Sequence, residues 1–243
     1  MTVSGTQQRT PSPSSPTMGL PALTSWSDGT AVKQLSSHTY EAHFVDDWCI
    51  GTGKIFSVEF LIHANFLSVP HGGYVTGTFL QVAKAHFNTT LSAQNQPHTI
   101  TLHLDFLRRT QEGPALFTVK DVKLGRQTSI IHVKLNQGDR DEVVGYITNS
   151  NMNRESGVTF STDWKLMPPP APVDLALLEQ DKDENWARQV AMPFAFFRKA
   201  TQKTQFHFPR IGQKKKSSAD EWIRLKSGEK WTNTSLGYVA DMW

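Results

Sequence analysis

Hydrophobic positions between residues 74 and 149 follow first a helical and then a strand period. Val75, Phe79, Val82 and Ala83 recur at i, i+4, i+7 and i+8, which predicts one apolar helical face over residues 74–87. Only Lys84 is formally charged in this segment, so we expect the helix to be buried on most sides. Residues 98–108 then alternate between apolar and polar side chains, which predicts a strand with two different faces.

Further strand signals lie on both sides of this helix. Residues 116–124, 128–135 and 143–149 are predicted strands joined by short turns, and residues 39–49 and 54–63 are predicted strands before the helix. The loops between the later strands are too short for the helical crossovers that parallel strands need. The pattern therefore predicts an α+β fold, in which an antiparallel sheet wraps around an apolar helix.

Composition shifts divide the rest of the chain. Residues 1–24 are rich in Ser, Thr, Pro and Gln and are predicted to form a disordered N-terminal arm before a first unit over 25–150. A Pro-rich stretch ends a predicted linker over 151–172. A second unit is predicted over 173–243, with helical character at 173–189, a strand at 204–209 and a helix starting near Thr234.

Charge and cysteine content narrow the choice of partners and location. The 243 residues carry 25 Lys and Arg against 22 Asp and Glu, a near balance that gives no reason to expect nucleic acid. The single cysteine, Cys49, excludes an internal disulfide and a multi-cysteine metal site. Since no apolar run has bilayer length and the N-terminus lacks a signal-like core, we expect an intracellular, cytoplasmic protein without a membrane span. A peroxisomal location stays open.

Several short segments resemble one family in order and spacing. Residues 71–77 (HGGYVTG), 104–109 (LDFLRR) and 123–129 (KLGRQTS) resemble the helix start, the next strand end and a hairpin of hot-dog thioesterases. Residues 222–224 (WIR) and 238–241 (YVAD) resemble the second half of type II acyl-CoA thioesterases, which carry two hot-dog units in one chain. The resemblance implies a hot-dog fold, a curved antiparallel sheet around a central helix, with one complete unit and a second unit cut short. It also implies an acyl-CoA or other acyl thioester as ligand and no cofactor or metal.

The resemblance also implies site residues. The catalytic Asp of the family falls on Asp241, whereas its Thr and Gln partners lie on later strands of the second unit that this sequence does not contain. Thr99 occupies the equivalent position of the Thr in the first unit, if the two halves are pseudo-symmetric. The missing strands leave hydrolytic competence open.

The chemistry of thioester hydrolysis assigns roles to the same region. The backbone N–H groups of Gly72, Gly73 and Tyr74, at the helix start, could hold an oxyanion. His71 could orient a carbonyl or a water, and Asp241 could activate that water. The alternatives are a tight turn at the two glycines, a capping histidine, an exposed helix charge at Asp241, and for Thr99 a hydroxyl on the polar face of a strand.

Three functions fit these residues. The first is a hydrolase that cleaves an acyl-CoA or related thioester with an activated water. The second is a non-catalytic acyl-binding or scaffold protein derived from a truncated double hot-dog thioesterase. The third, hydration or dehydration of an enoyl thioester, ranks last because it needs an Asp/His pair near the helix start, and the sequence places only His71 there. Zinc and serine hydrolase motifs are missing from the sequence. We also expect a homo-oligomer, because a hot-dog sheet without its partner unit exposes an edge strand and apolar surface.

Overall fold

A computed structural model describes residues 24–51, 68–154, 156–195 and 197–242. The predicted arm, apart from Thr24, and the predicted strand over residues 54–63 lie outside these described residues.

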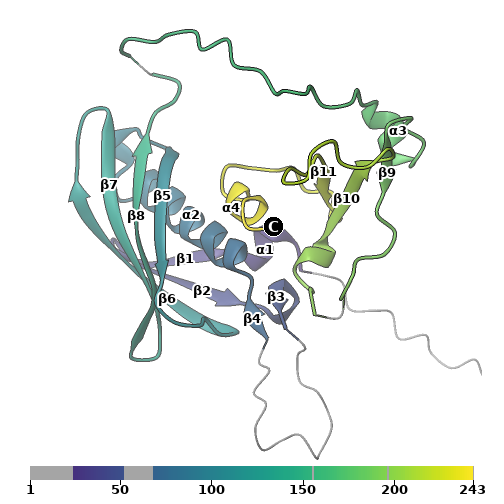
Figure 1. Ribbon diagram of the computed structural model, residues 1–243. Helices are drawn as coiled ribbons and strands as arrows, with labels where there is room; N and C mark the ends of the chain where they lie inside the picture. Colours follow the sequence, from purple (N-terminus) through teal and green to yellow (C-terminus); the bar gives the residue numbers. More distant parts are fainter. Residues whose placement is uncertain (1–23, 52–67, 155, 196, 243) are drawn as a thin grey trace, which may run out of the picture.

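The largest element of the structure is a six-stranded antiparallel sheet (Figure 1). Its strand order is β1-β2-β6-β7-β8-β5, and neighbouring strands are antiparallel throughout. The strands are β1 (Val32–Ser36), β2 (Thr39–Phe44), β5 (His98–Phe106), β6 (Gly113–Lys123), β7 (Thr128–Gln137) and β8 (Arg140–Ser150). The predicted antiparallel sheet is confirmed, and β1 is a strand that the sequence pattern did not indicate.

Helix α2 (Gly72–Asn88) lies along the inner face of this sheet (Figure 1). Its predicted burial is confirmed, because Val75, Phe79 and Val82 are fully buried. They belong to one core cluster with apolar side chains of the sheet, and the rings of Phe79 and Phe117 meet edge to face at 5.2 Å. The hot-dog fold class is therefore confirmed. The helix begins two residues earlier than predicted, so Gly72 and Gly73 form its first turn.

Strand boundaries differ from the prediction where the chain leaves the large sheet. Strand β2 ends at Phe44, and the 3₁₀ turn η1 (Asp46–Trp48) leads into β3 (Cys49–Ile50), which pairs with β4 (Val69–Pro70). Strand β5 alternates as predicted, but it lies at the sheet edge and ends at Phe106. Two apolar side chains of this strand, Ile100 and Phe106, are 44% and 50% exposed.

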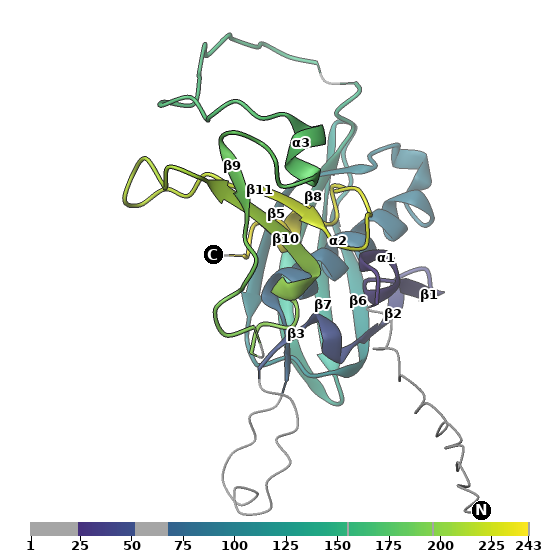
Figure 2. The same ribbon diagram turned by 90° about the vertical axis from the view of Figure 1, so that its right-hand side faces the viewer.

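A smaller three-stranded sheet lies on the other side of α2 (Figure 2). Its order is β11 (Trp222–Leu225), β10 (Thr204–Pro209), β9 (Trp186–Arg188). The strand prediction for 204–209 is confirmed, whereas the helical prediction for 173–189 is wrong beyond α3 (Leu175–Glu179). The helix ends early because Asp181 is left-handed, with φ at +59°, and the Asp183 side chain accepts hydrogen bonds from the following backbone. The domain boundaries stay a prediction.

Helix α4 (Leu236–Val239) packs directly on α2 through glycine. A methyl group at Gly73 would lie 2.7 Å from the Cα atom of Tyr238, and one at Gly237 would lie 2.8 Å from Thr76 Cγ2. Glycine permits this close approach of two backbones. The remaining short helical elements are α1 (Trp26–Gly29), η3 (Ser92–Gln94) and η4 (Thr201–Lys203). None of the helices in the described ranges has the length and apolarity needed to cross a bilayer.

Candidate functional site

The N-terminus of α2 is capped by a histidine. His71 is the N-cap residue, and its Nδ1 atom accepts a hydrogen bond from the Gly73 N–H at 3.1 Å. The side chain is almost buried, and its ring meets the Tyr238 ring at 5.2 Å. His71 thus satisfies one of the N–H groups that every helix start leaves without an intrahelical partner.

Asp241, near the end of the sequence, accepts a hydrogen bond from the same Gly73 N–H group. Its Oδ2 atom accepts a hydrogen bond from the Gly73 N–H at 2.6 Å and lies 3.5 Å from His71 Nδ1. The carboxylate is therefore at the positive end of the α2 dipole, where negative charge is stabilised. Its side chain remains 54% exposed, so water can reach it. The packing of α4 on α2 makes this contact between residues 168 apart in sequence.

The protonation state of His71 follows from its surroundings. Burial lowers the pKa of His71 below its ordinary value of 6.5, and the nearby Asp241 carboxylate opposes this shift. The imidazole is therefore neutral at neutral pH. In that state Nδ1 accepts the Gly73 N–H while Nε2 carries the proton. His71 thus acts at this position as a hydrogen-bond acceptor and not as a cation.

An open groove of about 550 Å³ runs beside this helix start. Helix α2, strand β5 and the region of α4 provide its walls. It is lined by Gly72, Thr76, Leu80, Leu102, Phe106, Leu236, Gly237, Ala240 and Asp241. Most of these side chains are apolar, and the carboxylate of Asp241 is the single charged group among them. The groove therefore combines a surface for an alkyl chain with one potential base.

The two glycines of the helix start face different surroundings. Gly72 lines the groove, and a methyl group there would lie 2.6 Å from Asp241 Oδ2. Gly73 instead faces the backbone of Tyr238. The Gly73 N–H is taken by His71 and Asp241, whereas the Gly72 N–H donates no hydrogen bond within the described part of the chain. Of the two, Gly72 presents the available donor to a ligand.

Of the other two predicted site residues, Tyr74 lies in the first turn of α2, where its backbone N–H was expected to act, and Thr99 lies away from the helix start. The Tyr74 side chain is fully buried, and its hydroxyl donates to the Gly29 carbonyl at 2.5 Å, so it belongs to the core. Thr99 donates to Asn149 Oδ1 at 2.9 Å and, together with Lys84, lines a neighbouring groove of about 310 Å³ that shares Leu80 with the larger groove. Lys84 is 12 residues after Gly72, about 18 Å along the helix.

Sequence reasoning missed the apolar walls of the larger groove. Leu102 and Phe106 lie on one face of the alternating strand, so the strand period indicated that they share a surface. The pattern gave no sign that this surface faces a ligand groove, because edge position and the packing of α4 are set by contacts distant in sequence. Leu236 and Ala240, in and next to a four-residue helix, carried no signal at all.

Comparison with known proteins finds relatives in sequence and in fold. Residues 63–150 match the family described as Acyl-CoA thioesterase N-terminal domain. The solved structure of a protein from Novosphingobium aromaticivorans DSM 12444, described as a thioesterase, superposes with a TM-score of 0.64 at 17% identity, over 87% of this chain and 71% of that one. A hot-dog protein from Alicyclobacillus acidocaldarius superposes with a TM-score of 0.58 at 16% identity, over 90% and 69%. The chain has the hot-dog fold. The resemblance to type II acyl-CoA thioesterases is confirmed.

A curated relative covers more of the sequence of this hot-dog protein. This chain is 32% identical over 234 residues to that relative, the thioesterase-like protein TwmA of Talaromyces wortmannii. The match takes in 89% of this chain and 62% of the relative. The hot-dog chain thus spans less than two thirds of the length of that relative.

Proposed function

We propose that the chain hydrolyses an acyl thioester of the acyl-CoA class at the N-terminus of α2. The observation that carries the proposal is the position of Asp241: an exposed carboxylate, held by the Gly73 N–H, in the wall of an apolar groove. A family match over residues 63–150 and a thioesterase-like relative support the same class of reaction.

The proposed reaction uses each part of the site once. The acyl chain lies in the apolar groove, and the thioester carbonyl lies against Gly72. Asp241 takes a proton from a water, whose oxygen attacks the carbonyl carbon. The Gly72 N–H and the helix dipole stabilise the resulting oxyanion. The C–S bond then breaks, the thiolate receives the proton from Asp241, and a carboxylic acid and a thiol leave.

His71 has a positioning role in this proposal. Its Nδ1 atom and Asp241 Oδ2 share one N–H donor, 3.5 Å from each other. A neutral imidazole can share the donor without attracting the carboxylate away from it. By occupying one side of this N–H group, His71 restricts where the Asp241 carboxylate can lie, while the proton transfer itself belongs to Asp241.

Asp241→Asn tests the proposal because it keeps the shape of the side chain and removes the base. Release of thiol from a panel of acyl-CoAs should fall by about 100- to 10,000-fold, the usual contribution of general-base catalysis. Asp139→Asn is the matched control, since it removes an exposed carboxylate from the turn between β7 and β8. Its turnover should equal that of the native chain.

Two results would overturn the proposed site or reaction. Native turnover that survives Asp241→Asn would place the site elsewhere in the first unit, in the groove that Thr99 lines. No turnover on any thioester, with acyl-CoA binding still measurable by calorimetry, would instead support the non-catalytic acyl-binding alternative.

A further inference from the structure

A second cluster of titratable side chains lies at the opposite end of α2. His38 is in the turn between β1 and β2, His86 is near the C-terminal end of α2, and Asp121 is near the end of β6. One potential ligand atom from each residue lies within 4.8 Å of the other two. His86 is 15 residues from His71, about 22 Å along the helix, so the cluster is separate from the proposed thioester site.

The distances within this cluster are close to those of a metal site. His86 Nε2 lies 2.9 Å from Asp121 Oδ1, and His38 Nε2 lies 3.3 Å from Asp121 Oδ2. In a tetrahedral zinc site with bonds of about 2.0–2.2 Å, neighbouring ligand atoms are about 3.3 Å apart. All three ligand atoms lie within 4.8 Å of one another, so binding requires the carboxylate and the His38 ring to rotate toward a common ion.

Outer contacts orient both imidazole rings. The Nδ1 atom of the fully buried His86 lies 2.9 Å from the Tyr40 hydroxyl, which donates to the Ser37 carbonyl at 3.4 Å. His38 Nδ1 lies 2.8 Å from Ser37 Oγ. In metal sites such contacts hold the ring and direct the other nitrogen to the ion. Both Nε2 atoms point in this way toward the same carboxylate.

We propose that His38, His86 and Asp121 bind a divalent transition-metal ion of the zinc type. Two imidazoles and a carboxylate suit this class of ion, and the bound ion displaces a proton from an imidazole nitrogen. His38 is 41% exposed and gives the ion access from solvent, so water completes the coordination. The three ligands come from a turn, a helix and a strand. A bound ion therefore fixes the end of α2 to the large sheet.

The same side chains can also form a hydrogen-bonded network without metal, and the experiment separates the two cases. The full chain, freed of metal with a chelator, is titrated with zinc chloride by calorimetry and with cobalt(II) by visible absorption. One equivalent of zinc should bind, the cobalt complex should show the absorption of a site with nitrogen and oxygen ligands, and the midpoint of thermal unfolding should rise with zinc concentration.

Matched variants assign the binding to these residues. His38→Ala removes an exposed ligand, and Asp121→Asn keeps the shape of the carboxylate, so both variants should fold and lose zinc binding. Tyr40→Phe should weaken it by about 10- to 100-fold through loss of the outer contact. His103→Ala is the control, because His103 is also a histidine beside an aspartate, 3.4 Å from Asp105, but is exposed on β5. Unchanged binding in His38→Ala and Asp121→Asn, or no saturable binding by the folded native chain, overturns the proposal.

Discussion

Adjacent residues at the start of α2 have different physical roles. Sequence reasoning treated Gly72 and Gly73 as one oxyanion-binding pair. In the structure Gly72 faces the Asp241 side chain and the groove, whereas Gly73 faces the backbone of Tyr238. A side chain can move away from an added methyl group more easily than a packed backbone can. The same substitution should therefore affect activity at one glycine and stability at the other.

Gly72→Ala and Gly73→Ala test this difference. Gly72→Ala should displace the exposed Asp241 carboxylate and reduce thiol release while leaving the urea unfolding curve close to native. Gly73→Ala should lower the free energy of unfolding by about 1–3 kcal/mol, the usual cost of overpacking. Thiol release and urea unfolding are measured on both variants. Equal losses of stability in the two variants would contradict the assignment.

The site residues show which parts of a site a sequence can predict. Asp241 could be predicted as a site residue only from the resemblance to a family. Its contact with Gly73 joins residues 168 apart, and no periodicity in the sequence spans such a distance. His71 and the glycines were recognisable as a break before an apolar helix. The different roles of Gly72 and Gly73 could not be predicted, since they depend on where α4 packs.

Among the helices, the buried one was predicted correctly from the sequence and the exposed, charged segment was not. Helix α2 presents apolar side chains at helical spacing because it lies within the core, so its period is strong. Residues 173–189 contain many charges and were predicted as a helix, yet only α3 is helical. There the chain is directed by local side-chain contacts, such as those of Asp183 with the N–H groups of Asn185 and Trp186. Such contacts leave no periodic signal.

A single carboxylate links α1 to the chain after β11. Glu229 accepts hydrogen bonds from the N–H groups of Trp26 and Ser27, at 2.7 and 2.9 Å, and from the hydroxyls of Ser27 and Ser227, at 2.5 and 2.7 Å. Burial raises the pKa of Glu229, but these hydrogen bonds together outweigh burial and lower the pKa from 4.5 to about 2. The charged form is therefore the one that stabilises this link.

The lowered pKa predicts how stability depends on pH. Because the folded pKa lies below the unfolded one, the contribution of Glu229 is complete above about 4.5 and is lost as the pH falls toward 2. Glu229→Gln should lower the free energy of unfolding at neutral pH and weaken its acid dependence in this window, measured by urea unfolding at a series of pH values. Glu184→Gln, at an exposed position before β9, is the control. A Glu229→Gln profile parallel to the native one would refute the prediction.

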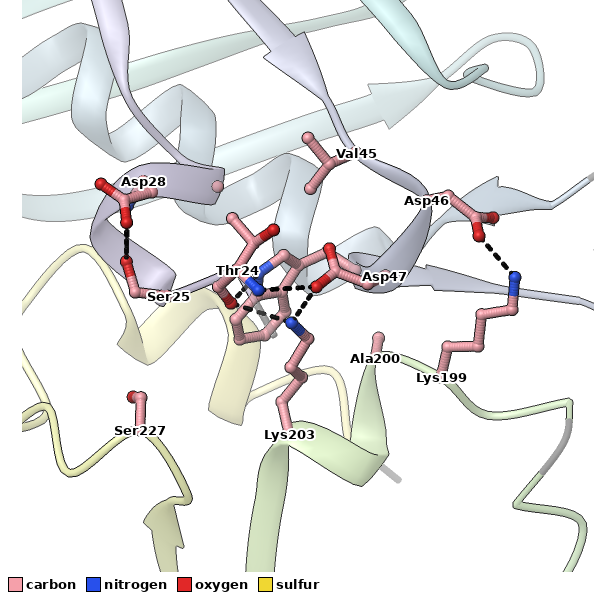
Figure 3. Close-up of polar contacts among 12 residues, drawn as sticks. Thr24, Ser25, Asp28, Val45, Asp46, Asp47, Lys199, Ala200, Lys203 and Ser227 are labelled. Atoms are coloured by element: carbon pink, nitrogen blue, oxygen red, sulfur yellow. Dashed lines mark hydrogen bonds and ion pairs between the residues drawn. The ribbon is translucent and has the colours of Figure 1, made fainter. Parts of the chain in front are cut away.

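At the scale of the whole molecule, lysines from the C-terminal part join the region around η1 (Figure 3). Lys203 Nζ pairs with Asp47 and donates to the Thr24 carbonyl at 2.8 Å, and it lies 5.0 Å from the centre of the Trp48 ring. Lys199 pairs with Asp46 at 2.6 Å. These contacts join the chain around η4 to the region of η1, and the Tyr238 hydroxyl, which donates to the Ala200 carbonyl at 2.7 Å, links α4 to the same segment.

The edge of the large sheet formed by strand β5 is relevant to contacts between copies of the chain. Strand β5 is the last strand in the order, and Ile100 and Phe106 on it are largely exposed. An edge strand with exposed apolar side chains favours pairing with another strand. Self-association of the chain stays a prediction, which light scattering across a range of protein concentrations tests.

The two lysines provide a final test of how the parts of the molecule depend on each other. The Lys203 side chain is 5% exposed, whereas Lys199 is 28% exposed and its partner Asp46 is 44% exposed. Removing one partner of a buried ion pair costs about 3 kcal/mol because the remaining charge loses its compensation, whereas an exposed pair contributes about 0–1 kcal/mol. Asp47 is 29% exposed, so water offsets part of the larger cost for the Lys203 pair. Lys203→Met should therefore destabilise the chain far more than Lys199→Met in urea unfolding. Because Asp241 reaches Gly73 only through the packing of this C-terminal part, Lys203→Met should also reduce thiol release while Lys199→Met leaves it near native. Equal effects of the two variants would show that the buried pair does not determine this packing.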